Sequence, residues 1–255
     1  MENKINFSEE LKNIQNCTWD RDLYDNYNHI LAFYMAQSVM ENTSKNSSLL
    51  DLACGDGTLL EMMSNHFSSI VGVDGSDKYL NLAKKKISTA KFYNSLIEDF
   101  NTDQKFDVVT LLCILEHVID PISILKKAAT FLKEDGIMIV HVPNALATNR
   151  VIAKIMGTLN NEYELSPFDI NVAGHRRSYD ISLLLTDIKN AKLKSISTGG
   201  IFYKMLSTPQ FDWFLKNGLW DNGFGWGRTD INNKNWKNEF CRACYKYGQL
   251  KPNEC

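Results

Sequence analysis

Between residues 48 and 142, short apolar runs alternate with segments whose apolar residues repeat at helical spacing. The apolar runs predict five strands, at Ser48–Ala53, Ile70–Val73, Lys91–Tyr93, Phe106–Leu112 and Gly136–Val142. The segments between them predict helices at Thr58–His66, Lys78–Ile87 and Ile122–Leu132. Strands joined by helical crossovers form a parallel sheet that is covered on both faces. The pattern therefore predicts an α/β, doubly wound fold.

The rest of the chain falls into regions of different character. Residues 1–44 predict an N-terminal helical cap, and residues 45–200 contain the predicted sheet. Within residues 45–200, residues 143–179 form a long connection of the kind that often borders a binding site. Residues 201–255 form a C-terminal extension. From Phe202 onward the chain holds 12 of its 28 aromatic residues, which can form a core, an acceptor pocket or a dimer surface.

Composition excludes some classes of partner. The 255 residues carry a formal net charge of −2, whereas proteins that bind nucleic acid usually present a basic patch. The start of the chain is polar, without a secretory signal, and no apolar run approaches the roughly 20 residues that span a bilayer. We therefore expect a cytoplasmic protein with no nucleic-acid or membrane partner, either a monomer or a homodimer.

The six cysteines show no disulfide pattern. Cys241 and Cys244 form a lone CxxC pair, but a structural zinc site needs two further ligands. The segment Phe240–Tyr247 is interpreted as a strand, which would place the two thiols on opposite faces of a sheet. We expect reduced thiols and no zinc.

The segment Asp51-Leu52-Ala53-Cys54-Gly55-Asp56-Gly57 carries the clearest chemistry. A strand that ends in Gly-x-Gly turns sharply and lets a ligand approach the backbone closely. A dinucleotide site has a third glycine, but Leu60 stands there. Asp74 ends the next strand, 19 residues after Gly55, where its carboxylate can accept both hydroxyls of a ribose. Ser76 is free to cap the following helix, so Asp74 remains available.

With these features, residues 49–142 resemble a class I S-adenosylmethionine-dependent methyltransferase of the small-molecule O-methyltransferase type. The segments that carry the resemblance are Asp51–Gly57, Asp74, Ile97–Phe100, Phe106–Val109, Leu115–Val118 and Val142–Asn144. The resemblance implies a mostly parallel, seven-stranded sheet, which the C-terminal extension would complete together with the acceptor pocket. It also implies S-adenosylmethionine as the cofactor and S-adenosylhomocysteine as its product.

The same resemblance assigns a cofactor site. The residues implied are Asp51, Ala53, Gly55, Gly57, Asp74, Gly75, Ile97, Glu98, Leu112 and Cys113, joined by Tyr24 and Tyr27 from the N-terminal region. Some relatives bind magnesium at a Glu-x-x-Glu-His segment after the fourth strand. Here Cys113 takes the first position, and a thiol is a poor ligand for a hard cation. The sequence therefore predicts no metal.

In the expected reaction, an acceptor atom attacks the methyl group of the cofactor as sulfur leaves. Catalysis then depends mainly on positioning the acceptor atom next to the methyl group, and a hydroxyl acceptor also needs a base. The chain lacks the Asn/Asp-Pro-Pro-aromatic motif of enzymes that methylate exocyclic amines. It also lacks the Pro-Cys motif of enzymes that methylate cytosine C5. O-methylation of a small polar acceptor, such as a sugar or nucleotide-activated polysaccharide precursor, is the leading hypothesis. A quinone- or lipid-pathway O-methyltransferase and a non-catalytic cofactor-binding module are the alternatives.

Candidates for the acceptor side come from three segments. His117 and His175 are equal candidates for the base, and Asn144 is a further catalytic candidate. Arg176, Arg177 and Tyr179 are expected to bind the acceptor, since paired guanidinium groups hold phosphate or carboxylate groups well.

Overall fold

The computed structural model describes residues 21–220 and 235–255. Residues 1–20 of the predicted N-terminal cap lie outside the described residues, as does Trp226 of the aromatic C-terminal region. The chain divides into two compact units. The described part of the first comprises Met35–Pro143 and Leu165–Ile196, and that of the second comprises residues 21–34, 144–164, 197–220 and 235–255.

The first unit is built on a five-stranded parallel sheet with the strand order β3-β2-β1-β4-β5. The strands are β1 (Ser48–Leu52), β2 (Ser69–Asp74), β3 (Lys91–Asn94), β4 (Phe106–Leu112) and β5 (Leu132–His141). The helices of this unit are the second half of α2 (Asp25–Glu41), α3 (Thr58–Met63), α4 (Asp77–Lys86), α5 (Pro121–Ala129), η2 (Asp169–Ala173) and α7 (Ile181–Asn190). The α/β, doubly wound prediction is confirmed, with each predicted strand present.

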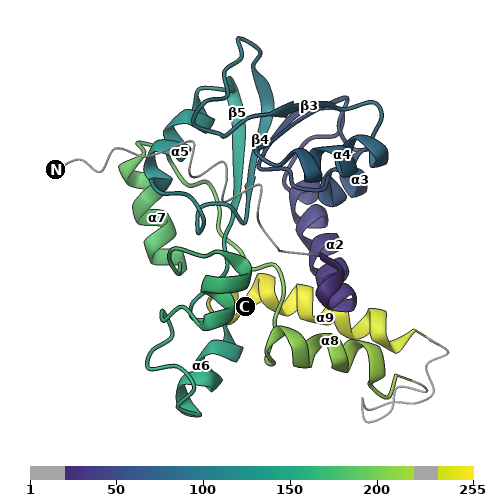
Figure 1. Ribbon diagram of the computed structural model, residues 1–255, viewed down its shortest axis with the longest axis vertical. Coiled ribbons are helices and arrows are strands. Elements are labelled where there is room, and N and C mark those ends of the chain that lie inside the picture. Colours follow the sequence, from purple (N-terminus) through teal and green to yellow (C-terminus); the bar gives the residue numbers. More distant parts are fainter. Residues whose placement is uncertain (1–20, 221–234) are drawn as a thin grey trace. The chain divides into compact units, whose positions relative to one another are not determined.

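Helices cover both faces of the sheet, as Figure 1 shows, with α5 and α7 on one side and α3 and α4 on the other. Successive strand residues point to opposite faces, so Leu50 and Leu52 pack with the α5 and α7 residues while Leu49 packs with those of α3 and α4. This alternation explains why the strands read as continuous apolar runs.

The second unit consists of helices around an aromatic core. It contains η1 (Arg21–Tyr24), the first half of α2 (Asp25–Glu41), α6 (Thr148–Ile155), α8 (Thr208–Asn217), α9 (Trp236–Leu250) and η4 (Pro252–Glu254). Phe211 is fully buried and meets the ring of Tyr27 edge-on at 5.6 Å between centroids, while Tyr34 stacks on Tyr245 at 4.8 Å. Aromatic residues of the C-terminal extension thus pack inward.

Two expectations about this extension are corrected. Among residues 202–220 and 235–255 the structure contains helices and no strand, so the extension does not complete the sheet, and the described sheet has five strands instead of seven. Cys241 and Cys244 lie in α9, where a spacing of three residues places both thiols on the same buried face. The apolar positions of Phe240–Tyr247 follow a helical period that the strand interpretation overlooked.

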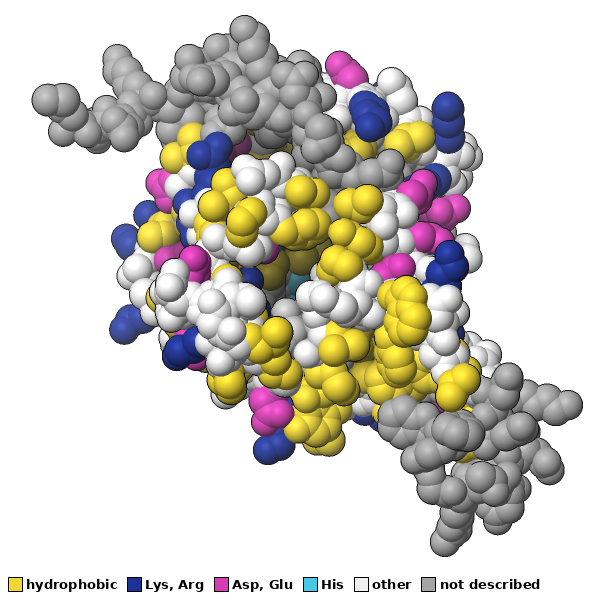
Figure 2. Space-filling view, turned by 60° about the horizontal axis from the view of Figure 1, so that its bottom comes forward, with side chains coloured by type: hydrophobic (Ala, Val, Ile, Leu, Met, Phe, Trp, Pro, Cys, Tyr) yellow, Lys and Arg dark blue, Asp and Glu magenta, His cyan; other side chains and the backbone are white. Residues whose placement is uncertain are grey.

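Within the described residues no helix has the length and apolar character needed to cross a membrane. Hydrophobic side chains nevertheless occupy much of the surface seen in Figure 2.

The aromatic core should govern the stability of the second unit. Phe211→Ala should lower the free energy of unfolding by about 3–5 kcal/mol, because it removes a fully buried ring. Trp213→Ala, on the same helix, should change it by only about 0.5 kcal/mol, since this side chain is 65% exposed. Chemical denaturation of both variants measures the difference, and equal losses would contradict the packing described.

Candidate functional site

The turn after β1 adopts an unusual backbone conformation. Ala53, Gly55 and Gly57 have φ angles of 68°, 55° and 76°, in the left-handed region. The backbone N–H groups of Ala53 and Cys54 both donate to the carbonyl oxygen of Val73, at 2.8 and 3.0 Å. The turn is therefore fixed to the end of β2. Because an L-residue pays about 1–2 kcal/mol for a left-handed conformation, surrounding contacts such as those with Val73 must hold Ala53 in place.

Gly55 and Gly57 differ in the space that a side chain would meet at each position. A Cβ atom at Gly57 would lie 2.8 Å from the Cβ of Ala83 in α4, so this glycine allows α4 to pack closely. A Cβ atom at Gly55 would meet no atom within 4 Å. Space next to the Gly55 backbone is therefore open, as the cradle of a ligand requires.

Asp74 links the two strand ends. Its Oδ2 accepts from the backbone N–H of Gly55 and its Oδ1 from that of Ser76, each at 2.8 Å. Ser76 caps α4, as predicted, with its hydroxyl accepting from Tyr79 N at 3.4 Å. A carboxylate has about four acceptor positions, so Asp74 retains capacity for a ribose. Burial raises the pKa of Asp74 despite these hydrogen bonds.

Asp51 is a second buried acid beside this turn. It is 3% exposed and accepts a hydrogen bond of 2.7 Å from the Thr110 hydroxyl. Burial, with the charge of Asp74 adding to it, raises the pKa of Asp51 to about 7. No described basic side chain forms an ion pair with either acid. Two buried carboxyl groups without such a partner favour a cationic ligand.

The remaining residues expected at the cofactor lie at neighbouring positions of the first unit. The Gly75 carbonyl accepts from Asn94 Nδ2 at 3.5 Å, and the Glu98 carbonyl accepts from Lys127 at 3.3 Å. The Ile97 side chain is buried in the core, so a ligand would meet its backbone. Leu112 ends β4, and Cys113 follows with a left-handed φ of 56°.

His141 ends β5 at the same edge of the sheet. It pairs with Leu112 in the sheet, so both side chains lie on the same face. Its Nδ1 is buried without a hydrogen-bond partner. Burial lowers the pKa of His141 to about 4, so the ring is neutral near pH 7. Ligands bind at the carboxyl ends of the strands in such sheets, so the position of His141 at a strand end is the sequence feature that indicates a site residue.

Arg176 and Arg177 have structural roles that the sequence did not reveal. Arg177 donates to the carbonyl oxygens of Leu115, Val118 and Ile119. Arg176 Nε donates to the His117 carbonyl at 2.7 Å. These contacts hold the loop after β4 in place, because guanidinium groups satisfy carbonyls that would otherwise lack donors.

Tyr179 also belongs to the structural framework, and the acceptor role expected for it stays a prediction. It is 2% exposed, and its hydroxyl lies 2.8 Å from Asp187 Oδ2. Burial, with the hydrogen bond to Asp187 adding to it, raises its pKa above the usual range.

Three candidates lie in the second unit. The Asn144 amide nitrogen donates to the Cys255 carbonyl at 2.7 Å, and its Oδ1 accepts from Leu146 N, so it has structural contacts and its catalytic role stays a prediction. Tyr27 is buried in the aromatic core, where its ring contacts Phe211. Tyr24 ends η1 and is partly exposed. The roles of the two tyrosines at the cofactor stay predictions.

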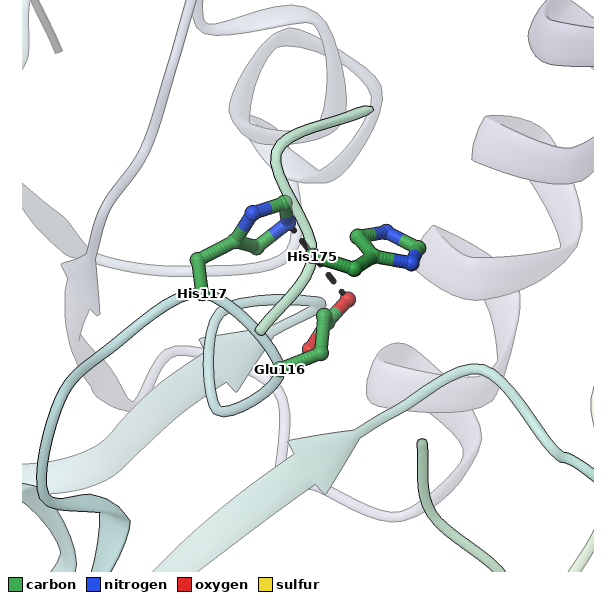
Figure 3. Close-up of side chains that lie close together, drawn as sticks. All are labelled: Glu116, His117 and His175. Atoms are coloured by element: carbon green, nitrogen blue, oxygen red, sulfur yellow. Dashed lines mark ion pairs between the residues drawn. The ribbon is translucent and has the colours of Figure 1, made fainter. Parts of the chain in front are cut away.

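Glu116, His117 and His175 come together although 58 residues separate the two histidines. The histidine rings lie 4.9 Å apart, nearly perpendicular, above the Glu116 carboxylate (Figure 3). Burial lowers the pKa of His117 to about 4, with the neighbouring His175 adding to the effect. Burial raises the pKa of Glu116 to about 8. The structure thus unites both base candidates with an acid that the sequence had marked only as part of a motif.

Comparison with known proteins agrees with this geometry. Residues 21–196 match a family model described as a methyltransferase domain. The chain is 35% identical over 106 residues to a ubiquinone biosynthesis O-methyltransferase of Actinobacillus pleuropneumoniae, covering 38% of this chain and 45% of the relative. It is 26% identical over 166 residues to one of Acinetobacter baylyi, covering 62% and 68%. The chain spans about half the length of most curated relatives that it matches.

Solved structures agree on the fold. A putative methyltransferase of Bacillus halodurans superimposes with a TM-score of 0.50 at 19% identity, covering 62% of this chain and 67% of that one. The open space at Gly55 and the buried acids Asp51 and Asp74 suit the adenosyl and cationic parts of S-adenosylmethionine, which has a ribose, a sulfonium and an amino group.

Substitution of each glycine by alanine separates their roles. Gly55→Ala should weaken binding of S-adenosylhomocysteine at least about tenfold, or 1.4 kcal/mol, because the methyl group enters the open space. Its stability should fall only by the left-handed backbone cost of about 1–2 kcal/mol. Gly57→Ala should lose about 1–3 kcal/mol more, through overlap with Ala83. Calorimetric titration measures the binding of S-adenosylhomocysteine, and chemical denaturation measures the unfolding free energy. Unchanged binding by Gly55→Ala would show that the open space at Gly55 does not hold the ligand.

The raised pKa of Asp51 predicts a pH effect on the cofactor-free protein. Its pKa is higher in the folded state than in the unfolded chain, so its stabilising contribution is complete below about pH 4 and disappears as the pH rises through about 7. Asp51→Asn should remove this part of the decline in unfolding free energy between pH 4 and 7. Asp107→Asn is a control of opposite sign, because Lys133 and Ser48 lower the pKa of Asp107 and its contribution is lost as the pH falls. An unchanged profile for Asp51→Asn would contradict the assignment.

Proposed function

The chain belongs to the family described as a methyltransferase domain, and we propose that it transfers a methyl group from S-adenosylmethionine to a hydroxyl group on an aromatic acceptor of the quinone-pathway type. The family membership makes the chain an enzyme, in place of the non-catalytic binding module considered above. The observation that carries the acceptor class is the resemblance to O-methyltransferases named for ubiquinone biosynthesis. Since only part of those relatives is matched, the acceptor belongs to the proposal.

The alternative acceptor, a sugar or an activated sugar, has less support. It depended on Arg176 and Arg177 as a clamp for an anionic group. Both side chains donate to backbone carbonyls of the loop after β4, so that argument is weakened. The named relatives favour the quinone-pathway alternative.

The chemistry of O-methylation requires the hydroxyl proton to leave as the oxygen attacks the methyl group. The acceptor oxygen must lie about 3–3.5 Å from the methyl carbon, in line with the bond to sulfur. Ligands of such sheets bind beyond the carboxyl ends of the strands, and His117 and His175 meet beyond the end of β4. An imidazole nitrogen there can take the proton as a general base.

An assay with paired acceptors tests the proposal. The protein with labelled S-adenosylmethionine should methylate a catechol-type phenol and leave a nucleotide-activated sugar unchanged, with the product identified by mass spectrometry. His117→Ala and His175→Ala should each lower kcat by about 10²–10⁴-fold without weakening S-adenosylhomocysteine binding, since they act on the acceptor. His29→Ala, at an exposed position of α2, is the matched control.

Two results would refute the proposal separately. Methylation of the sugar and not of the phenol would overturn the acceptor class. Full turnover by the variant that lacks both His117 and His175 would overturn their role while leaving the acceptor class intact.

A further inference from the structure

His141 has an enclosed ring nitrogen that the protein leaves unsatisfied. Its Nδ1 is shielded from water and has no hydrogen-bond partner, although the residue as a whole is only half-buried. Nearly all buried polar atoms of native proteins are hydrogen-bonded, so an exception at the end of a strand requires an explanation. Because Nδ1 is enclosed and the residue is not, the ring presents its other nitrogen, Nε2, to the accessible side.

The register of the sheet shows which face His141 occupies. Two residues before it, Ile139 of β5 pairs with Thr110 of β4. Thr110 in turn pairs with Asp51 of β1 and donates its hydroxyl hydrogen bond to that carboxyl group. Paired residues of neighbouring strands have side chains on the same face, and so do residues two apart along one strand. His141 therefore lies on the face of Asp51, one row nearer to the carboxyl edge of the sheet.

This placement leaves room for an acceptor between the methyl donor and His141. Strands about 4.8 Å apart and residues about 3.3 Å apart along a strand put the Cα atoms of His141 and Asp51 roughly 12 Å apart. The methyl donor is expected at Gly55 and Asp74, at the ends of β1 and β2, and the strand order continues from β1 through β4 to β5. An acceptor over the ends of β4 and β5 would then have the donor on one side and His141 on the other.

The enclosed nitrogen also determines where the His141 ring carries its proton. A neutral imidazole has a proton on one nitrogen and a lone pair on the other, and burial keeps this ring neutral near pH 7. A buried N–H group without an acceptor is rarer in native proteins than a buried acceptor without a donor. The proton is therefore on Nε2, and the ring offers an N–H donor to a ligand.

We propose that His141 is a further catalytic residue, whose Nε2–H group donates a hydrogen bond to the acceptor oxygen as that oxygen loses its proton. The inference rests on the proposed function. His117 or His175 takes the proton, the oxygen forms its bond to the methyl carbon, and the bond from carbon to sulfur breaks with its electron pair left on sulfur. His141 keeps its own proton throughout and stabilises the negative charge that develops on the oxygen, as a fixed donor in a site shielded from water does.

Such a donor also favours oxygen over nitrogen as the atom that is methylated. A neutral amine has one lone pair, and a hydrogen bond from His141 would occupy it. A hydroxyl oxygen that has lost its proton has further lone pairs, so it accepts the hydrogen bond and attacks the methyl group at the same time. The inference thus gives a physical reason for an oxygen acceptor.

Substitutions of His141 in the full-length protein test the donor. His141→Phe should lower kcat with a catechol by about 10²–10³-fold, as loss of one donor to a developing oxyanion does, without weakening S-adenosylhomocysteine binding. His141→Gln should recover much of this loss, because its amide nitrogen reaches the position of Nε2, whereas the shorter His141→Asn should not. His29→Phe, which replaces an exposed histidine of α2, is the control and should keep full activity.

Ionisation of a bound phenol gives a readout that a merely structural role would not change. A nitrocatechol changes its visible absorption when it loses a proton, and S-adenosylhomocysteine in the cofactor site prevents its methylation. The pKa of the bound nitrocatechol should be higher by at least about one unit in His141→Phe than in the unaltered protein, a tenfold lower ionisation constant. Thermal unfolding identifies a variant that fails to fold, in which case His141→Gln against His141→Asn provides the same comparison.

The possible results separate this inference from the proposed function. Methylation of phenols at equal rates by the protein and by His141→Phe, or an unchanged pKa of the bound nitrocatechol, would overturn the role of His141 and leave the acceptor class intact. A shift of this pKa that depends on His141, in a protein that methylates no phenol, would support the donor and refute the proposed acceptor.

Discussion

The hydrogen bond from the Gly55 N–H group to Asp74 Oδ2 joins the ends of β1 and β2, and the cofactor edge of the sheet depends on it. The turn after β1 has a strained backbone, with left-handed residues at Ala53, Gly55 and Gly57. Such a conformation persists only where surrounding contacts determine it. Asp74 provides one contact and the Val73 carbonyl provides another. The open space beside Gly55 is thus shaped before any ligand arrives, which lowers the entropic cost of binding.

A second set of backbone contacts fixes the loop after β4. Arg177 donates to three carbonyls of this loop, and Arg176 donates both from its backbone and from its side chain. These bonds attach the segment that begins at His175 to the loop that carries Glu116 and His117. The guanidinium groups of the two arginines are therefore needed inside the fold. Their contribution to an acceptor is indirect, through the placement of the histidines.

The sequence predicted the parts of the fold that depend on local patterns. Strands buried on both faces read as apolar runs, and the spacing of Gly55 and Asp74 placed both at neighbouring strand ends. The helix α9 was misjudged, because aromatic and cysteine residues suit a strand as well as a buried helix face. The contact of His175 with Glu116 depends on how the chain folds back after residue 165, and no local pattern reports it. The same holds for the structural role of Tyr179.

Buried carboxyl groups recur along the carboxyl edge of the sheet, and their charge suits the reaction. Asp51 is the residue before the last of β1, Asp74 ends β2 and Glu116 follows β4, each less than 10% exposed. Acids held away from water favour positive charge nearby, such as a sulfonium, an ammonium group or a metal ion. When an ionised acceptor oxygen attacks the methyl group of a sulfonium, opposite charges are neutralised as the bond forms. A site from which water is excluded strengthens the attraction between these charges, whereas water would stabilise the separated ions. Under the proposed function, the buried acids at these strand ends would attract the cationic methyl donor.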